Sequence, residues 1–170
     1  MTDTATAEHA THSAPPPLQW GEGLVTGDAR MDDTHEEFVA LLEALRALPA
    51  DAQLDPYREL VRHTEAHFAQ EDRWMVATGF TPQNCHSMQH NSVLDTMREV
   101  EKHHLQGDTE IIGRMADALA DWFPQHARSM DAGLAQHLQA MGYDSRTETL
   151  ADPSRVAGLT QSGCGSSGCS

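Results

Sequence analysis

Histidine and carboxylate side chains recur at one-turn spacing along this chain, and they are side chains that bind metal ions. His67 and Glu71 are four positions apart, as are His86 and His90. On a helix, residues four apart lie on the same face. Imidazole and carboxylate groups both serve as ligands of divalent metals in proteins. The spacing therefore predicts a metal site to which separate helices contribute paired ligands.

His35 and the pair His126 and Asp131 are further candidate ligands. His126 and Asp131 are five positions apart, so on an ideal α-helix their side chains would diverge by about 140°. Two arrangements could still use both residues. Asp131 could point across the bundle axis and bridge two metals, or a local π-helical turn could bring it round to the face of His126.

Four helical segments are predicted to position these side chains. Apolar residues recur at spacings of three and four, and the segments span residues 32–48, 55–78, 82–106 and 108–141. Asp55 and Asp108 are predicted N-caps, Thr81 precedes Pro82 at another predicted start, and glycines 79, 107 and 142 are predicted stops. Pro124 should interrupt and kink the last helix. Short connections then predict an all-α fold, an antiparallel up-down-up-down four-helix bundle with an N-terminal arm and flexible tails.

The chain divides into three predicted regions. Residues 1–17 have the composition of a disordered tail, residues 18–142 form the bundle with its arm, and residues 143–170 form a C-terminal extension with a Gly/Ser/Cys-rich end. Cys164 and Cys169 in that end could be a redox-active pair, a soft-metal clip or a tether, through which a redox partner could act. Cys85 is expected to be a thiol that does not bind metal.

Composition excludes several classes of function. The formal net charge is −15, from 11 Lys+Arg against 26 Asp+Glu, which disfavours binding to nucleic acid or to anionic membrane surfaces. We find no run of transmembrane length and no signal peptide, so we expect a soluble, cytoplasmic protein. A strongly anionic surface also favours a monomer.

The arrangement of the candidate ligands resembles the hemerythrin family, in particular its single-domain bacterial members. The resemblance spans about Leu18 to Gly142 and is carried by Trp20, Met31-Asp-Asp-Thr-His35, His67-Phe-x-x-Glu71-Asp72, Gly79-Phe80, His86-x-x-x-His90 and Trp122-x-x-x-His126-x-x-x-x-Asp131. It implies two non-haem iron ions joined by an oxo or hydroxo bridge. One iron would be bound by His86, His90 and His126, the other by His35 and His67, and Glu71 and Asp131 would bridge them.

These implied ligands leave one coordination position open. The first iron would have six donors and the second five, so the open position lies on the iron held by His35 and His67, and a small ligand can bind there. The site has fewer anionic donors than the Glu-rich di-iron sites of ferritin-like proteins, which favours reversible O2 binding over substrate oxidation. We expect oxygen storage, delivery or scavenging, and not primarily an enzyme. The alternatives are an O2- or redox-sensing module and a di-iron peroxidase or nitric-oxide-handling enzyme.

The remaining side chains of interest have subordinate expected roles. Phe38, Phe68 and Trp122 are expected by resemblance to line the O2 pocket, with Met75 and Phe123 as weaker candidates. His63, one turn before His67, could replace it as a ligand but is expected to be a partly exposed neighbour. The other histidines are expected to face solvent: His9, His12, His103, His104 and His137.

Overall fold

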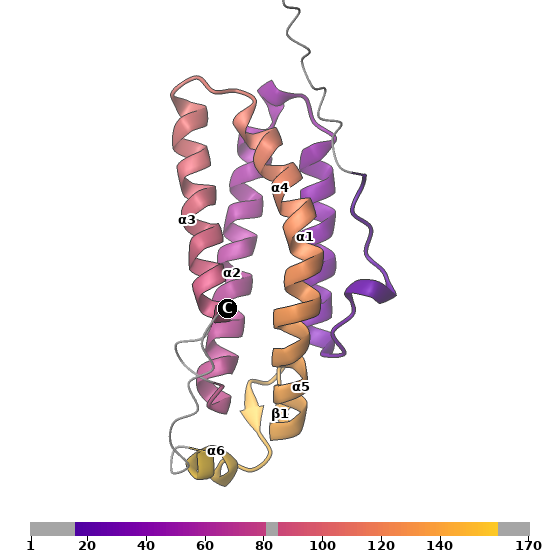
Figure 1. Ribbon diagram of the computed structural model, residues 1–170, viewed down its shortest axis with the longest axis vertical. Helices are drawn as coiled ribbons and strands as arrows, with labels where there is room; N and C mark the ends of the chain where they lie inside the picture. Colours follow the sequence, from indigo (N-terminus) through magenta and orange to yellow (C-terminus); the bar gives the residue numbers. More distant parts are fainter. Residues whose placement is uncertain (1–15, 81–84, 160–170) are drawn as a thin grey trace, which may run out of the picture.

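The computed structural model describes residues 16–80 and 85–159, and the described chain is a helical bundle (Figure 1). Its long helices are α1 (Ala29–Arg46), α2 (Leu54–Thr78), α3 (Cys85–Leu105) and α4 (Ile111–His126), and α4 continues through the π-helical turn η3 (Ala127–Asp131) into α5 (Ala132–Met141). The shorter elements are the 3₁₀ turns η1 (Glu22–Leu24) and η2 (Ala50–Ala52), strands β1 (Tyr143–Asp144) and β2 (Thr149–Leu150), and α6 (Ser154–Leu159). The predictions about residues 1–15, Thr81, Pro82, Cys164 and Cys169 lie outside the described residues.

The long helices close into a ring around one interior. Helix α1 packs on α2, α2 on α3, α3 on α4, and α4 returns to α1. In Figure 1 the connections from α1 to α2 and from α3 to α4 lie at the upper end, and α5 continues α4 at the lower end. Every long helix therefore has a face that can supply side chains to a shared interior.

The first two helices begin earlier than the sequence predicted. Helix α1 begins at Ala29 because the side chain of Asp28 accepts hydrogen bonds from the backbone N–H groups of Arg30 and Met31, which is ordinary N-capping. Helix α2 begins at Leu54, so the prediction that Asp55 is its N-cap is wrong. Pro56 still lies in the first turn, where its missing N–H costs no intrahelical hydrogen bond.

Glycines end the helices where the sequence predicted, but one predicted cap is wrong. Gly79, Gly107 and Gly142 adopt positive φ values of 68°, 110° and 68° after α2, α3 and α5, a conformation that favours glycine. Helix α4 begins at Ile111 after Glu110, so Asp108 is not its N-cap. The Asp108 carboxylate instead accepts a hydrogen bond from Arg114 at 2.6 Å.

Pro124 does not interrupt the last long helix. Helix α4 is α-helical across Pro124 to His126, and the irregular turn follows it as η3. At the junction the Ala127 N–H points to the carbonyls of both Phe123 and Pro124. The predicted single helix over 108–141 is therefore three segments, and the π-helical one lies between His126 and α5.

Two apolar clusters lie on either side of the histidine positions along the helices. The larger cluster includes Phe38, Leu60, Met97 and Leu119, and the smaller one includes Met31, Trp74, Leu134 and Leu138. On α1 the order is Met31, His35, Phe38, and on α2 it is Phe68, Glu71, Trp74. The buried polar residues thus form a layer between the two clusters.

A short hairpin closes the lower end of the bundle. Strands β1 and β2 pair antiparallel, and Tyr143 joins the smaller apolar cluster. The Ser145 hydroxyl donates to the capping carboxylate of Asp28 at 2.8 Å, and Arg73 pairs with Glu148 at 2.8 Å. These contacts hold the hairpin against the starts and ends of the ligand-bearing helices.

Among the described residues, no helix has both the length and the apolar character needed to cross a membrane.

Candidate metal centre

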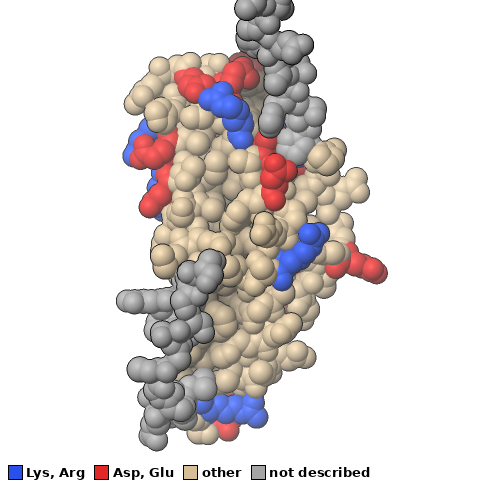
Figure 2. Space-filling model, in the orientation of Figure 1, with Lys and Arg blue, Asp and Glu red and all other residues tan. Residues whose placement is uncertain are grey.

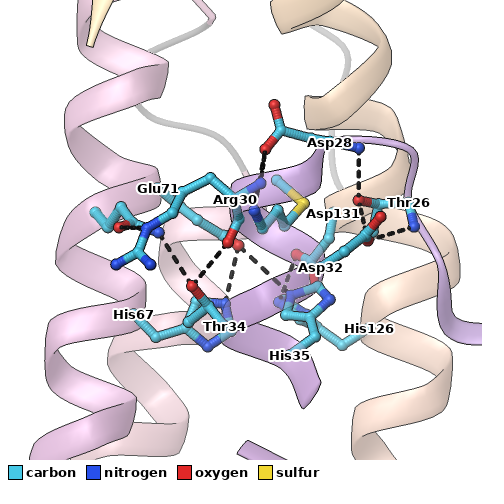
Figure 3. A network of polar contacts seen from close by, with 12 residues as sticks. Thr26, Asp28, Arg30, Asp32, Thr34, His35, His67, Glu71, His126 and Asp131 are labelled. Atoms are coloured by element: carbon cyan, nitrogen blue, oxygen red, sulfur yellow. Dashed lines mark hydrogen bonds and ion pairs between the residues drawn. The ribbon is translucent and has the colours of Figure 1, made fainter. Parts of the chain in front are cut away.

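Five imidazoles and two carboxylates converge in the buried polar layer. Figure 3 shows His35, His67, Glu71, His126 and Asp131 directed toward one another from α1, α2 and the α4–η3 segment. Helix α3 adds His86 and His90. All seven side chains are at most 3 % exposed: His35, His67, Glu71, His86, His90, His126 and Asp131. The structure thus brings together every ligand that the sequence predicted.

The carboxylate of Glu71 divides its two oxygens between two sets of histidines. Its Oε1 lies 3.0 Å from His67 Nε2 and 3.8 Å from His35 Nε2. Its Oε2 lies 3.2 Å from His86 Nε2 and 3.5 Å from His90 Nε2. One oxygen therefore faces each set of rings.

Asp131 has the same relation to the two sets. Its Oδ2 lies 3.2 Å from His35 Nε2, while its Oδ1 lies 2.9 Å from His86 Nε2 and 3.1 Å from His126 Nε2. The ligand atoms accordingly form two compact groups that could each hold a metal ion: His35, His67 and Glu71 in one, and His86, His90, His126 and Asp131 in the other.

The π-helical turn explains how His126 and Asp131 can share one site. Residues 127–131 form η3, and in a π-helix residues five apart lie about one turn apart. His126 Nε2 and Asp131 Oδ1 are therefore only 3.1 Å apart. Of the two arrangements left open by the sequence, the π-helical turn is present, and Asp131 also reaches across to His35 on α1.

The inward atoms fit metal ligation better than hydrogen bonding. His35 Nε2, His86 Nε2, Glu71 Oε2 and both oxygens of Asp131 are buried and have no hydrogen-bond partner among the described residues. They nevertheless lie within 2.9–3.8 Å of neighbouring ligand atoms. A buried polar atom without a partner is costly. Lone pairs directed into one shared space are what a metal ion would satisfy.

The two carboxylates are ionised and are balanced by the surrounding rings. Burial and the Asp131 charge act to raise the pKa of Glu71, yet His67 and His35 hold it well below its usual range. Burial likewise acts to raise the pKa of Asp131, and His126, His35 and His86 lower it well below its usual range. Anionic oxygens at the centre of a buried site favour a cation there.

The pKa values of the buried imidazoles shift in opposite directions. Burial lowers the pKa of His35 and of His86, but Asp131 and Glu71 outweigh it and raise each pKa to about 9. Burial dominates at His90 and lowers its pKa to about 3. In the metal-free protein, protonated His35 and His86 therefore supply part of the positive charge that a bound metal ion would supply.

Aromatic rings enclose both groups of ligands. The Phe68 ring stacks on His90 with centroids 3.8 Å apart, and the Trp122 ring stacks on His126 at 4.3 Å. The edge of Phe123 meets His35 at 5.1 Å, and Phe38 lies 4.7 Å from Phe123. Phe38 and Phe123 are thus on the side of His35, and Trp122 is on the side of His126. Met75 belongs to the smaller apolar cluster.

A polar network that the sequence did not reveal lies beside His67. Arg30 Nε donates to Gln70 Oε1 at 3.1 Å, and Gln70 Nε2 donates to Thr34 Oγ1 at 3.4 Å. Figure 3 shows Arg30 and Thr34 near His67. His63 points its Nε2 to the Thr34 carbonyl at 3.2 Å and is half-buried. It therefore lies next to the ligand groups without belonging to either, as expected.

Two expectations about other residues need correction. His137 does not face solvent, because it is half-buried, its Nε2 lies 3.1 Å from the Thr78 carbonyl and its ring contacts Phe80. Cys85 is disulfide-bonded, so it is not a free thiol beside His86. His103 is exposed as expected, whereas His104, also expected to face solvent, is half-buried with its Nδ1 buried.

Sequence reasoning also missed Gln89. Its Oε1 lies 3.2 Å from His126 Nδ1, across the contact between α3 and α4. Nothing in the spacing of Gln89, one position before His90, indicates a contact with a residue of another helix.

The bundle and its buried layer define a class of protein, a helical bundle with a histidine-rich metal-binding centre. Residues 26–138 match the family described as "Hemerythrin HHE cation binding domain", and the chain belongs to the hemerythrin family. It is 40 % identical over 139 residues to a bacteriohemerythrin of Ralstonia nicotianae, covering 80 % of this chain and 99 % of that one. Bacteriohemerythrins of Pseudomonas paraeruginosa and Pseudomonas aeruginosa are 26 % and 25 % identical, covering 85 % of this chain and 94 % of theirs. No solved structure matches the chain.

Proposed function

We propose that this protein binds O2 reversibly at a pair of iron ions held by the two ligand groups, for oxygen storage, delivery or scavenging. When bound, the iron pair would supply the electrons that make O2 binding possible. The observation that carries the proposal is the unequal pair of groups, two imidazoles against three, sharing two carboxylates that turn one oxygen to each.

The ligand assignment follows these groups. His86, His90 and His126 would hold one iron, and His35 and His67 the other. Glu71 and Asp131 would bridge both, together with an oxo or hydroxo bridge from solvent. The His35–His67 iron then has one ligand fewer, and its open position is where O2 would bind.

The surrounding rings would keep that position dry. Phe38 and Phe123 lie at His35, and Phe68 lies 5.3 Å from His67 by ring centroids. Exclusion of water suppresses side reactions at such a site. We propose Phe38, Phe68 and Trp122 as lining of the O2 pocket, and the geometry adds Phe123, while the Trp122 ring itself packs on His126.

The half-buried His63 beside the centre supports O2 binding without a catalysed reaction. His63 lies 6.3 Å from His67 by ring centroids, and burial lowers its pKa. With its Nε2 on the Thr34 carbonyl, a neutral His63 is neither a charged acid nor directed at the open position. We infer that the protein is not primarily an enzyme.

The charge distribution of the surface does not favour nucleic acid as a partner. On the face in Figure 2, the few basic side chains are scattered among acidic ones. The ion pairs of the described residues include Arg58, Arg98 and Lys102, each paired with a carboxylate. This is not the basic surface that nucleic acid needs. We propose a cytoplasmic monomer, with a redox partner acting through the cysteine-containing C-terminal tail. We also propose an up-down-up-down topology, which the two connections at the upper end in Figure 1 support.

One spectrum tests the proposal. The iron-loaded protein is reduced without oxygen, and air is then admitted. A visible absorption band that appears with O2 and disappears when O2 is removed is the expected result. Absence of that band, or immediate full oxidation with release of hydrogen peroxide, would overturn reversible binding and favour the peroxidase or oxidase alternative.

A further inference from the structure

The five histidines of the centre differ in the partner of Nδ1, the ring nitrogen that faces away from the carboxylates. Each ring directs Nε2 toward the carboxylates or a neighbouring ring. Within residues 16–80 and 85–159, the Nδ1 atoms of His35, His67, His86 and His90 are buried and have no hydrogen-bond partner. His126 is different, since its Nδ1 lies 3.2 Å from Gln89 Oε1.

When a metal occupies Nε2, this contact favours the tautomer of His126 that carries its proton on Nδ1. A neutral imidazole carries one proton, and the nitrogen without it is the one that can bind a metal. The Gln89 oxygen can only accept a hydrogen bond, so it stabilises the proton on Nδ1 and leaves the lone pair on Nε2. That Nε2 lies 3.1 Å from Asp131 Oδ1, so the lone pair is directed into the ligand group.

Two neighbours together fix the orientation of the ring. Gln89 holds its edge, and Trp122 covers one face at an interplanar angle of 26°. Both residues, with His126, line a surface hollow of about 510 Å³ whose other walls are Gln125, Ser129 and Met130. His126 lines this hollow although it is only 2 % exposed, and Gln89 is the half-buried neighbour that contacts its outer edge.

We propose that Gln89 is a positioning residue, which holds His126 in its Nδ1–H tautomer and sets its strength as a metal ligand. The proposal rests on metal binding at the proposed centre and does not require O2 binding. Hydrogen bonds of this kind to metal-bound histidines orient the ring and make it a stronger donor, and their loss typically lowers metal affinity about 10- to 100-fold.

The test uses Zn(II), which accepts imidazole and carboxylate ligands and has no redox reaction with O2. The variants are Gln89→Leu, which removes the acceptor, and Gln89→Glu, which keeps an acceptor and adds charge. Gln125→Leu and Gln125→Glu are matched controls, because Gln125 lines the same hollow and is exposed. Zn(II) affinity is measured by competition with a chelator, and the His126 Nδ1–H signal by NMR of the ¹⁵N-histidine-labelled zinc protein.

We expect Gln89→Leu to bind zinc about 10- to 100-fold more weakly and to lose the slowly exchanging His126 Nδ1–H signal. Gln89→Glu should keep the zinc affinity and the Nδ1–H signal of the wild type, because it keeps the acceptor. The Gln125 variants should also match the wild type. Unchanged affinity and signal in Gln89→Leu, an equal loss in Gln125→Leu, or no recovery in Gln89→Glu would overturn the proposal. If the variants give the expected zinc results but the iron-loaded wild type shows no reversible O2 band, the proposed function is overturned and the role of Gln89 is not.

Discussion

At the scale of single residues, the centre depends on ring nitrogens and carboxylate oxygens that all point into one shared space. All five imidazoles present Nε2 inward, and the carboxylates of Glu71 and Asp131 each turn one oxygen to either group. His63 shows that a neighbouring histidine does not become a ligand by proximity alone. Its Nε2 is directed to the Thr34 carbonyl and therefore away from the shared space.

This contrast predicts different outcomes for two alanine variants. His126→Ala removes one of three rings from its group and leaves Asp131 Oδ1 with one histidine neighbour fewer, so it should lose metal. His63→Ala should retain the metal content of the wild type. Elemental analysis of the purified, iron-reconstituted proteins measures both. Loss of metal in His63→Ala with retention in His126→Ala would mean that the ligands are assigned wrongly.

At the scale of secondary structure, the turn η3 (Ala127–Asp131) decides whether the last helix can supply two ligands. A π-helical turn is equivalent to one extra residue in an α-helix. The flanking segments α4 and α5 can therefore each keep their place in the bundle while Asp131 turns toward His126. Helices α2 and α3 need no such turn, because their paired ligands are four residues apart.

The turn predicts opposite effects of removing and adding one residue. Deletion of Ser129, which is exposed, leaves the aspartate four residues after His126, on the same face of an ordinary α-helix. That variant should fold and bind metal. Insertion of one alanine after Ser129 should rotate Asp131 and α5 by about 100° relative to α4 and lose most bound metal.

Circular dichroism and metal content compare these two variants with the wild type. Equal metal loss in both would show that the turn has a requirement beyond register, and equal retention in both would show that Asp131 is dispensable.

At the scale of the whole molecule, a layer of ionisable groups separates two apolar clusters. Without metal, the layer is held by protons on His35 and His86, whose pKa values of about 9 lie above the usual 6.5. A pKa raised by folding contributes stability that is fully present below 6.5 and is lost as the pH rises through 9. A bound metal requires the neutral rings, so its binding strengthens over the same range.

The metal-free protein should therefore become less stable between pH 6.5 and 9, while the stabilisation caused by zinc grows. Thermal unfolding with and without Zn(II) at both ends of this range measures the effect. A loss of about 1 kcal/mol would lower Tm by about 2–4 °C in a chain of this size. A pH-independent Tm in the metal-free protein, or zinc stabilisation that shrinks with pH, would contradict this account.

The sequence by itself determined the helical class and which residues are candidate metal ligands. Spacings of four place His67 with Glu71 and His86 with His90 on any α-helix, because the helix repeat is local and does not depend on packing. The glycines that end α2, α3 and α5 were also predictable, because the positive φ at a helix end is a local preference of glycine. Helix starts were less so, since Asp28, Asp55 and Asp108 are all plausible caps and only one of them caps.

The tertiary structure decided how these residues meet. The division of each carboxylate between two groups, the π-helical turn before Asp131 and the contact of His126 Nδ1 with Gln89 Oε1 all depend on how α1 to α4 pack. His126 and Asp131 read as diverging on an isolated helix, yet lie 3.1 Å apart. The physical reason is that contacts between helices are long-range. The energy of bringing buried ligands together can select a π-helical turn that local preference alone would not.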